Sequence, residues 1–109
     1  MPQLSTVLPT INGPDYHRVA ASQTSNALGT IGAVGDVLDG LLVVPVTTSP
    51  GAISVTDNGG SAISVFSGGT GSLLALVPFF IPIGARATGQ GWLVTTGANV
   101  SVLATGNFT

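Results

Sequence analysis

The sequence contains no lysine, no glutamate and no cysteine. Charged side chains make up 6% of its 109 residues, where an average domain has about 25%. This scarcity excludes a nucleic-acid-binding protein that works through a basic patch, a charge-rich coiled coil and an acidic disordered tail. The absence of cysteine excludes a disulfide framework and any thiolate metal site, and it leaves the redox compartment open.

Hydrophobic residues are abundant by contrast, at 44% of the chain, and the net charge is only −2. Much of the polar surface must therefore come from Gly, Ser, Thr and Asn. These uncharged residues oppose association between molecules less than charged residues do. We infer that other subunits cover part of the folded surface. The longest apolar run, residues 73–83, is interrupted by Pro78 and Pro82 and is too short to span a bilayer, so no membrane partner is expected. Residues 1–3 lack the basic region that begins a secretory signal, so no such signal is expected.

Residues 1–26 differ from the rest and are predicted to form an extended N-terminal arm. They hold three of the seven prolines and show neither strand alternation nor a helical stripe. One interpretation is a frayed terminus, and the other is a segment that orders on a neighbouring subunit or partner. In the second case the interface residues would be Leu4, Val7, Leu8, Ile11, Tyr16 and Arg18.

Residues 27–109 are predicted to form one β-domain, because β-branched residues alternate there between closely spaced Gly, Pro, Asn and Asp. Residues 36–46 indicate a long strand, bulged or bent at Gly40 and edge-like near Pro45. Residues 48–51 supply the Pro and Gly of a type II turn. The fold class predicted is all-β, as a small antiparallel β-sandwich or jelly-roll-like barrel.

A hairpin is predicted where the tetrapeptide Ala-Ile-Ser-Val, at residues 52–55 and again at 62–65, flanks Asp57-Asn58-Gly59-Gly60. In both copies Ile and Val should point to one face and Ala and Ser to the other. Three more strands are expected, at residues 73–83, 92–96 and 99–105. A Val-Thr-Thr then Gly-Ala echo, at residues 46–52 and 94–98, indicates either two related hairpins or low-complexity usage.

Catalytic chemistry is not indicated by any constellation of residues. His17 is the single histidine, and no Gly-x-Ser-x-Gly elbow is present. Asp36 and Asp39 should lie on opposite faces of a strand, and Asp57 is interpreted as a turn residue in preference to a cation ligand. We therefore expect no catalytic, metal-binding or cofactor-binding residues, and no enzyme.

Aromatic and charged residues of the second half supply further interface candidates. Phe79 and Phe80 are adjacent in a strand, so one should face the core and the other an interface. Arg86 either pairs with an aspartate at a subunit boundary or faces water as a solvated residue. Trp92 is expected in the core.

Three stretches resemble small structural proteins of tailed bacteriophages, namely GDVLDGLLVVP at residues 35–45, TSPGA at 48–52 and FSGG at 66–69. In particular, the chain is similar to head decoration, or capsid cement, proteins over residues 32–106. The resemblance implies a homo-oligomer, expected to be a trimer, bound to the major capsid protein on the capsid exterior of the virion after synthesis in the host cytoplasm. The alternative is a carbohydrate- or host-surface-binding β-module of a phage fibre or tail, with Tyr16 and Trp92 as stacking residues.

Overall fold

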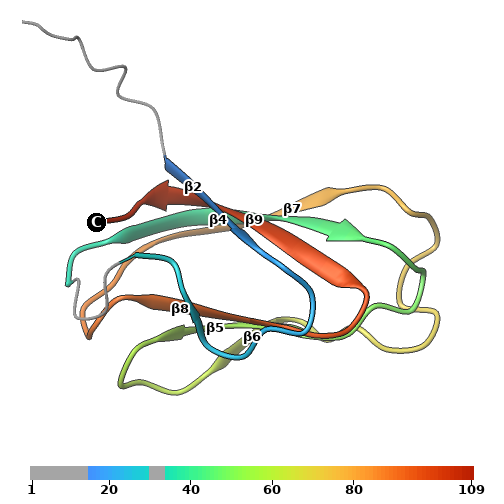
Figure 1. Ribbon diagram of the computed structural model, residues 1–109, viewed down its shortest axis with the longest axis horizontal. Coiled ribbons are helices and arrows are strands. Elements are labelled where there is room, and N and C mark those ends of the chain that lie inside the picture. The colour runs from blue at the N-terminus through green and yellow to red at the C-terminus, as the bar shows by residue number, and fades with distance from the viewer. Residues whose placement is uncertain (1–14, 30–33) are drawn as a thin grey trace, which may run out of the picture.

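The computed structural model describes residues 15–29 and 34–109, which form two four-stranded antiparallel sheets. The first sheet has the strand order β2-β9-β4-β7, and the second has the order β3-β8-β5-β6. Figure 1 shows the two sheets as stacked layers. The strands are β2 (Asp15–Val19), β3 (Asn26–Ala27), β4 (Val37–Pro45), β5 (Ile53–Asp57), β6 (Ile63–Phe66), β7 (Phe79–Arg86), β8 (Trp92–Thr96) and β9 (Val100–Asn107).

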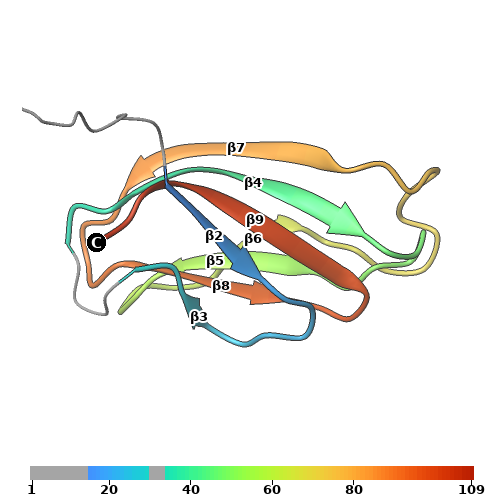
Figure 2. The same ribbon diagram turned by 45° about the horizontal axis from the view of Figure 1, so that its top comes forward.

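The chain changes sheet at every connection between these strands except the hairpin that joins β5 to β6. This order and alternation define a jelly roll, in which eight strands form two Greek keys. Figure 2 shows β2, β9, β4 and β7 above and the second sheet below. The all-β sandwich expected from the sequence is confirmed, in its jelly-roll form. Within the described ranges, no helix is long and apolar enough to cross a membrane.

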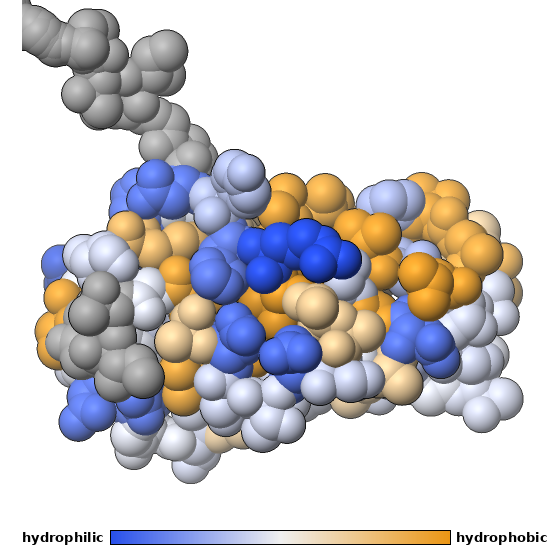
Figure 3. Space-filling model, viewed as in Figure 1, coloured by the Kyte–Doolittle hydropathy of each residue, from blue (hydrophilic) through white to orange (hydrophobic). Residues whose placement is uncertain are grey.

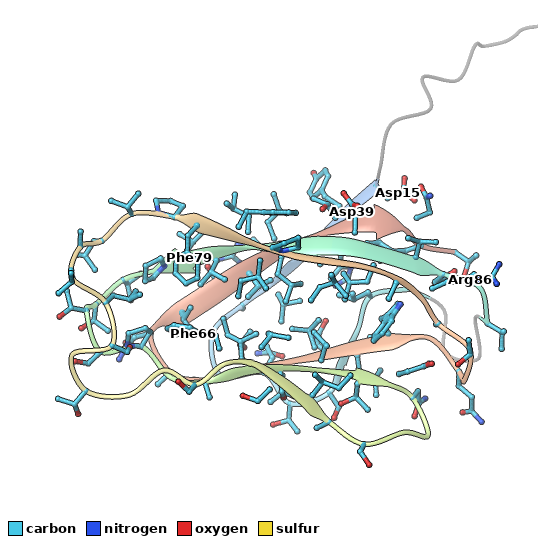
Figure 4. All side chains as sticks on the ribbon, turned by 180° about the vertical axis from the view of Figure 1, so that it is seen from behind. Asp15, Asp39, Phe66, Phe79 and Arg86 are labelled. Carbon is cyan, nitrogen blue, oxygen red and sulfur yellow. The ribbon has the colours of Figure 1, made fainter. Side chains whose placement is uncertain are left out.

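The core lies between the two sheets and follows the two-residue period of the strands. Along β9, the inward-facing Val100, Val102 and Ala104 are fully buried, while the residues between them are half-buried on the outer side. At the β6 and β7 edges, the rings of Phe66 and Phe79 meet edge to face, with centroids 5.5 Å apart (Figure 4). Apolar contact across the gap therefore holds the layers together.

Strand β4 is central, with β9 on one side and β7 on the other. Its pairing with both neighbours is interrupted between Leu38 and Gly40, which confirms the predicted bulge. Pairing with β7 ends at Val43, so Pro45 has only β9 beside it. Proline has no N–H to donate, and it is tolerated at this position because no second strand pairs with it there. The predicted edge-like position of Pro45 is confirmed.

The predicted hairpin is confirmed as β5 and β6. The N–H of Gly60 donates to the carbonyl of Asp57 at 2.7 Å, and Gly59 takes the positive φ of 98° that the turn requires. The two identical tetrapeptides are nevertheless not equivalent. Ile53 in β5 is fully buried, whereas Ile63 is 54% exposed because β6 is an edge strand whose register with β5 shifts by one residue.

Strand β7 begins only at Phe79, so the strand predicted from residue 73 is wrong for its first six residues. Residues 67–78 instead connect β6 in one sheet to β7 in the other, and a connection between layers cannot pair along either sheet. The prediction that the prolines of this run exclude a central strand is confirmed, since among the described strands β7 pairs with β4 alone.

The type II turn predicted at residues 48–51 is wrong, because Gly51 lacks the positive φ that such a turn needs. Gly51 is instead a point of close backbone contact, where an added Cβ would lie 2.6 Å from the Cα of Gly97. The N–H of Gly51 also donates to the carbonyl of Ala98 at 2.9 Å. The echoed Gly-Ala pairs are therefore two adjacent connections between the sheets and not two hairpins.

Residues 15–26, assigned above to the arm, lie in the sandwich. Strand β2 pairs with β9 over five residues, from Asp15 opposite Gly106 to Val19 opposite Val102, and Val19 is fully buried. Asn26 begins β3 in the second sheet. The apolar candidates of the arm, Leu4, Val7, Leu8 and Ile11, lie outside the described residues.

Candidate functional site

The outer face of the first sheet carries a row of side chains that crosses all four strands. Arg18 on β2 is the register partner of Leu103 on β9, and Leu103 is the partner of Leu42 on β4. Leu42 is in turn the partner of Phe80 on β7, whose ring is 49% exposed. Side chains of such partners lie within contact distance, so three of them form an apolar strip with Arg18 at its end.

A second row runs parallel to the first and contains Tyr16, Thr105, Gly40 and Pro82. The ring of Phe80 lies over Gly40, where an added Cβ would collide with the ring. Tyr16 is 73% exposed. Three of the interface residues expected from the sequence, Tyr16, Arg18 and Phe80, thus share one face of the sandwich.

Beside the first row, the outer face is hollowed. A shallow hollow of about 270 Å³ is lined by Arg18, Leu42, Val44, Ser101, Val102 and Leu103. Four of these six residues are apolar, and the other two are Ser101 and Arg18. We call it the outer hollow.

The apolar outer face explains the composition of β4. A sandwich strand with one wet face alternates apolar and polar residues, as β9 does where Ser101 and Thr105 point outward. Strand β4 instead places Leu42 and Val44 outward and Leu41 and Val43 inward. It therefore has the composition of a strand that is covered on both faces.

The connection between β6 and β7 presents a second apolar surface. The sequence analysis did not identify this surface because it assigned residues 73–78 to a strand. Leu74 is entirely exposed, and Leu76 and Val77 are more than half exposed. Three hydrogen bonds fix this loop to the β4–β5 connection: Gly69 N–H to the Pro50 carbonyl, Gly71 N–H to Ser49 Oγ, and Leu73 N–H to the Thr48 carbonyl. Figure 3 shows hydrophobic side chains gathered at this end of the molecule. We call Leu74, Leu76 and Val77 the apolar tip.

Phe79 and Phe80 do point to opposite sides of the sheet, as predicted. Phe79 packs toward the core and against Phe66, so in the single chain it is not part of the outer face. Phe80 is the outward member of the pair.

Three of the charged residues, Asp15, Asp39 and Arg86, lie toward the same end of the molecule (Figure 4). Asp36 is buried and immediately precedes β4, whereas Asp39 is exposed within that strand. Arg86 is exposed near the end of β7. The carboxylate of Asp36 bonds Thr109: its Oδ2 accepts hydrogen bonds from the N–H and the hydroxyl of that residue.

Asp57 links two turns at the end of the second sheet. Its Oδ2 accepts hydrogen bonds from the N–H groups of Thr88 and Gly89, at 2.8 and 2.9 Å, so the carboxylate bonds the β7–β8 loop and not its own turn. Oδ1 is buried without a hydrogen bond of good geometry. Burial alone would raise the pKa of Asp57, but these donors, the Thr88 hydroxyl and, more weakly, the N–H of Gly91 hold its pKa below its ordinary value.

The residues singled out for chemistry have structural partners. The ring Nε2 of His17 lies 3.3 Å from Oδ1 of Asn26, which joins the edge strands of the two sheets. Trp92 is 6% exposed, and its indole N–H donates to the carbonyl of Asp36 at 3.2 Å. The part of the chain that the structure describes contains no group of three or more metal-ligating side chains.

The fold and this surface define a class: a jelly-roll sandwich with an apolar outer face and an apolar tip at one end. Comparison of the chain with protein-family models, with curated proteins and with solved structures found no match.

Proposed function

We propose that the protein is a structural component of a phage virion, which binds the outside of the capsid as a homo-oligomer and bridges neighbouring capsid subunits. The observation that carries this proposal is the apolar strip of Leu103, Leu42 and Phe80 on the outer face. Contiguous apolar surface of this kind marks an interaction site on a soluble protein. An enzyme would need a site of paired acid, base or nucleophile groups, and His17 and Asp57 are engaged in structural contacts.

The fold is compatible with this role without specifying it. Jelly rolls occur in viral capsid proteins and in lectins, and a fold by itself does not determine function. The stabilising mechanism is physical: a protein that binds the assembled shell and not its separated subunits favours assembly by mass action.

The alternative, a carbohydrate-binding module, needs exposed aromatic rings beside polar groups in a concave site. Trp92 cannot serve, because it is buried in the core. Tyr16 remains exposed and lines a hollow with Asp15, Leu28, Phe108 and Thr109, so one stacking residue of the two is left.

Two measurements test the proposal. Native mass spectrometry of the purified protein is expected to show a stable oligomer, with three copies as the expected number. Immunogold labelling of particles of the phage that encodes the protein is expected to decorate the outside of the head. A protein that stays monomeric at high concentration and does not label phage heads would contradict the proposal, and binding to a glycan array would favour the alternative.

A further inference from the structure

The turn between β5 and β6 contains the dipeptide Asn58-Gly59, whose reactive groups are not held by the fold. Asn58 is half-buried and Gly59 is exposed. Within the described ranges, neither the side-chain amide of Asn58 nor the main-chain N–H of Gly59 has a hydrogen-bond partner. The bond that closes the turn runs from the N–H of Gly60 to the carbonyl of Asp57 and leaves both groups unbonded.

The main-chain nitrogen after an asparagine lies one bond away from closing a five-membered ring on the Cγ of that asparagine. A side chain on the following residue hinders the approach, and glycine has none. An added Cβ at Gly59 would meet nothing within 4 Å, so the peptide between residues 58 and 59 has room to rotate.

We propose that Asn58 is a site of spontaneous deamidation, in which the nitrogen of Gly59 displaces ammonia from the side-chain amide. The N–Cγ bond forms and the bond from Cγ to the amide nitrogen breaks, and the proton of the attacking nitrogen leaves with the ammonia. One water then adds to the cyclic imide without any redox change. Opening at Cγ gives aspartate, and opening at the main-chain carbonyl gives isoaspartate, whose backbone is longer by one methylene. The chemistry does not depend on the proposed function.

Water reaches this turn through a shallow hollow of about 440 Å³, whose lining includes Asn58, Gly59 and, from the β7–β8 loop, Gln90. One hydrogen bond opposes the reaction. The carbonyl of Asn58 accepts the N–H of Gln90 at 3.1 Å, and rotation of the peptide that follows Asn58 breaks this bond. Loss of a single hydrogen bond should slow the reaction by about tenfold or less relative to a free peptide.

The other described asparagines are less suited to the reaction. The side-chain Oδ1 of Asn26 is in a hydrogen bond, and the residue after it has a side chain. Asn99 precedes the fully buried, β-branched Val100, and Asn107 precedes Phe108, whose N–H is bonded. Among the described asparagines, Asn58 should therefore react first.

Deamidation alters the contact between the β5–β6 turn and the β7–β8 loop. The N–H of Asn58 donates to the carbonyl of Gly91 at 2.7 Å, beside the bond from Gln90. Both products place a second carboxylate next to Asp57, and isoaspartate also shifts the bonded groups by one methylene. The melting temperature of the modified protein should fall by several degrees, as expected for loss of about one hydrogen bond in a domain of this size.

Peptide mass spectrometry of the full chain, incubated at physiological temperature in heavy-oxygen water, tests the proposal. Trypsin separates residues 1–18 from residues 19–86, so reaction at Asn12, which also precedes a glycine but lies outside the described residues, is distinguished from reaction at Asn58. Residue 58 is expected to gain the mass difference between a hydroxyl and an amino group, with one heavy oxygen, as a mixture of isoaspartate and aspartate. Its half-time should lie within about tenfold of that of a synthetic peptide of residues 53–64.

The matched control is Asn58→Ser, which removes the amide and should show neither the mass change at residue 58 nor a fall in melting temperature on incubation. Absence of conversion at Asn58 on the time scale of the peptide would overturn the proposal. Formation of aspartate without isoaspartate, or equally fast conversion at Asn99 or Asn107, would overturn it as well. None of these results bears on oligomerisation or capsid binding.

Discussion

At the scale of single residues, Trp92 and Asp36 connect the two sheets. The indole lies in the core from β8, and its N–H bonds the carbonyl of Asp36, the residue that precedes β4. The side chain of Asp36 also bonds Thr109, so one buried pair fixes the start of β4 and the end of the chain. Asp57 fixes two turns of the second sheet to each other, because its carboxylate accepts hydrogen bonds from the main-chain N–H groups of Thr88 and Gly89.

Trp92→Ala is expected to lower the free energy of unfolding by about 3–5 kcal/mol, because it removes a large buried side chain and leaves a cavity. Urea unfolding followed by circular dichroism measures this change. Trp92→Phe retains much of the ring and loses the hydrogen bond, so it should cost less. A loss below about 1 kcal/mol for the alanine variant would place Trp92 outside the core.

Asp57→Asn is expected to destabilise the protein at pH 7 and to have little effect at pH 2. The folded-state pKa of Asp57 is lowered, so its charged hydrogen bonds stabilise the fold above the unfolded pKa of about 3.9 and are lost as the pH falls through the folded pKa. Urea unfolding of both proteins across this range should show a difference of about 1 kcal/mol at neutral pH that disappears in acid. The exposed Asp39→Asn is the control, and an equal pH dependence there would contradict the assignment.

At the scale of elements, β2 and β4 decide how the outer face is built. Strand β2 completes the sheet beside β9 and brings Tyr16 and Arg18 onto it, while β4 supplies the apolar centre with Leu42. The hydrophobic run of β4 is visible in the sequence as residues 41–44. The sequence alone does not show which of these residues face the core. The sheet decides this: Leu41 and Val43 fill the core, and Leu42 and Val44 lie on the outer face.

Deletion of residues 1–14 is expected to leave the thermal unfolding temperature unchanged, since all eight described strands begin at Asp15 or later. The same deletion should abolish attachment to the capsid or to sister subunits if this segment orders on a partner. Deletion of residues 1–26, the whole of the arm expected from the sequence, would also remove β2 and the buried Val19. It should therefore destabilise the domain, and equal stability of the two truncations would contradict the role of β2.

At the scale of the whole molecule, six charged residues and a net charge of −2 leave electrostatics little part in association. The apolar outer face carries the proposed association. The oligomer and its capsid attachment should then depend on burial of apolar area, which salt does not screen.

Attachment to capsids is accordingly expected to change by less than about threefold in affinity between 50 mM and 500 mM NaCl, concentrations that shorten the screening length severalfold. Co-sedimentation of the protein with phage heads that lack it measures this affinity. A steep loss at high salt would show that ion pairs of Arg18, Arg86 or the aspartates carry the interface.

The all-β class, the bulge of β4, the β5–β6 hairpin and the opposite directions of Phe79 and Phe80 follow from the sequence alone. Strand alternation, glycine and proline are local signals, and local signals suffice for these features. Which strands become neighbours, and hence which residues share a surface, is decided by pairing across the whole chain. The apolar tip and the outer row from Arg18 to Phe80 arise in this way. The sequence predicts a strand at the tip because the composition of the tip suits one. The tip does not pair as a strand because residues 67–78 pass from one layer to the other.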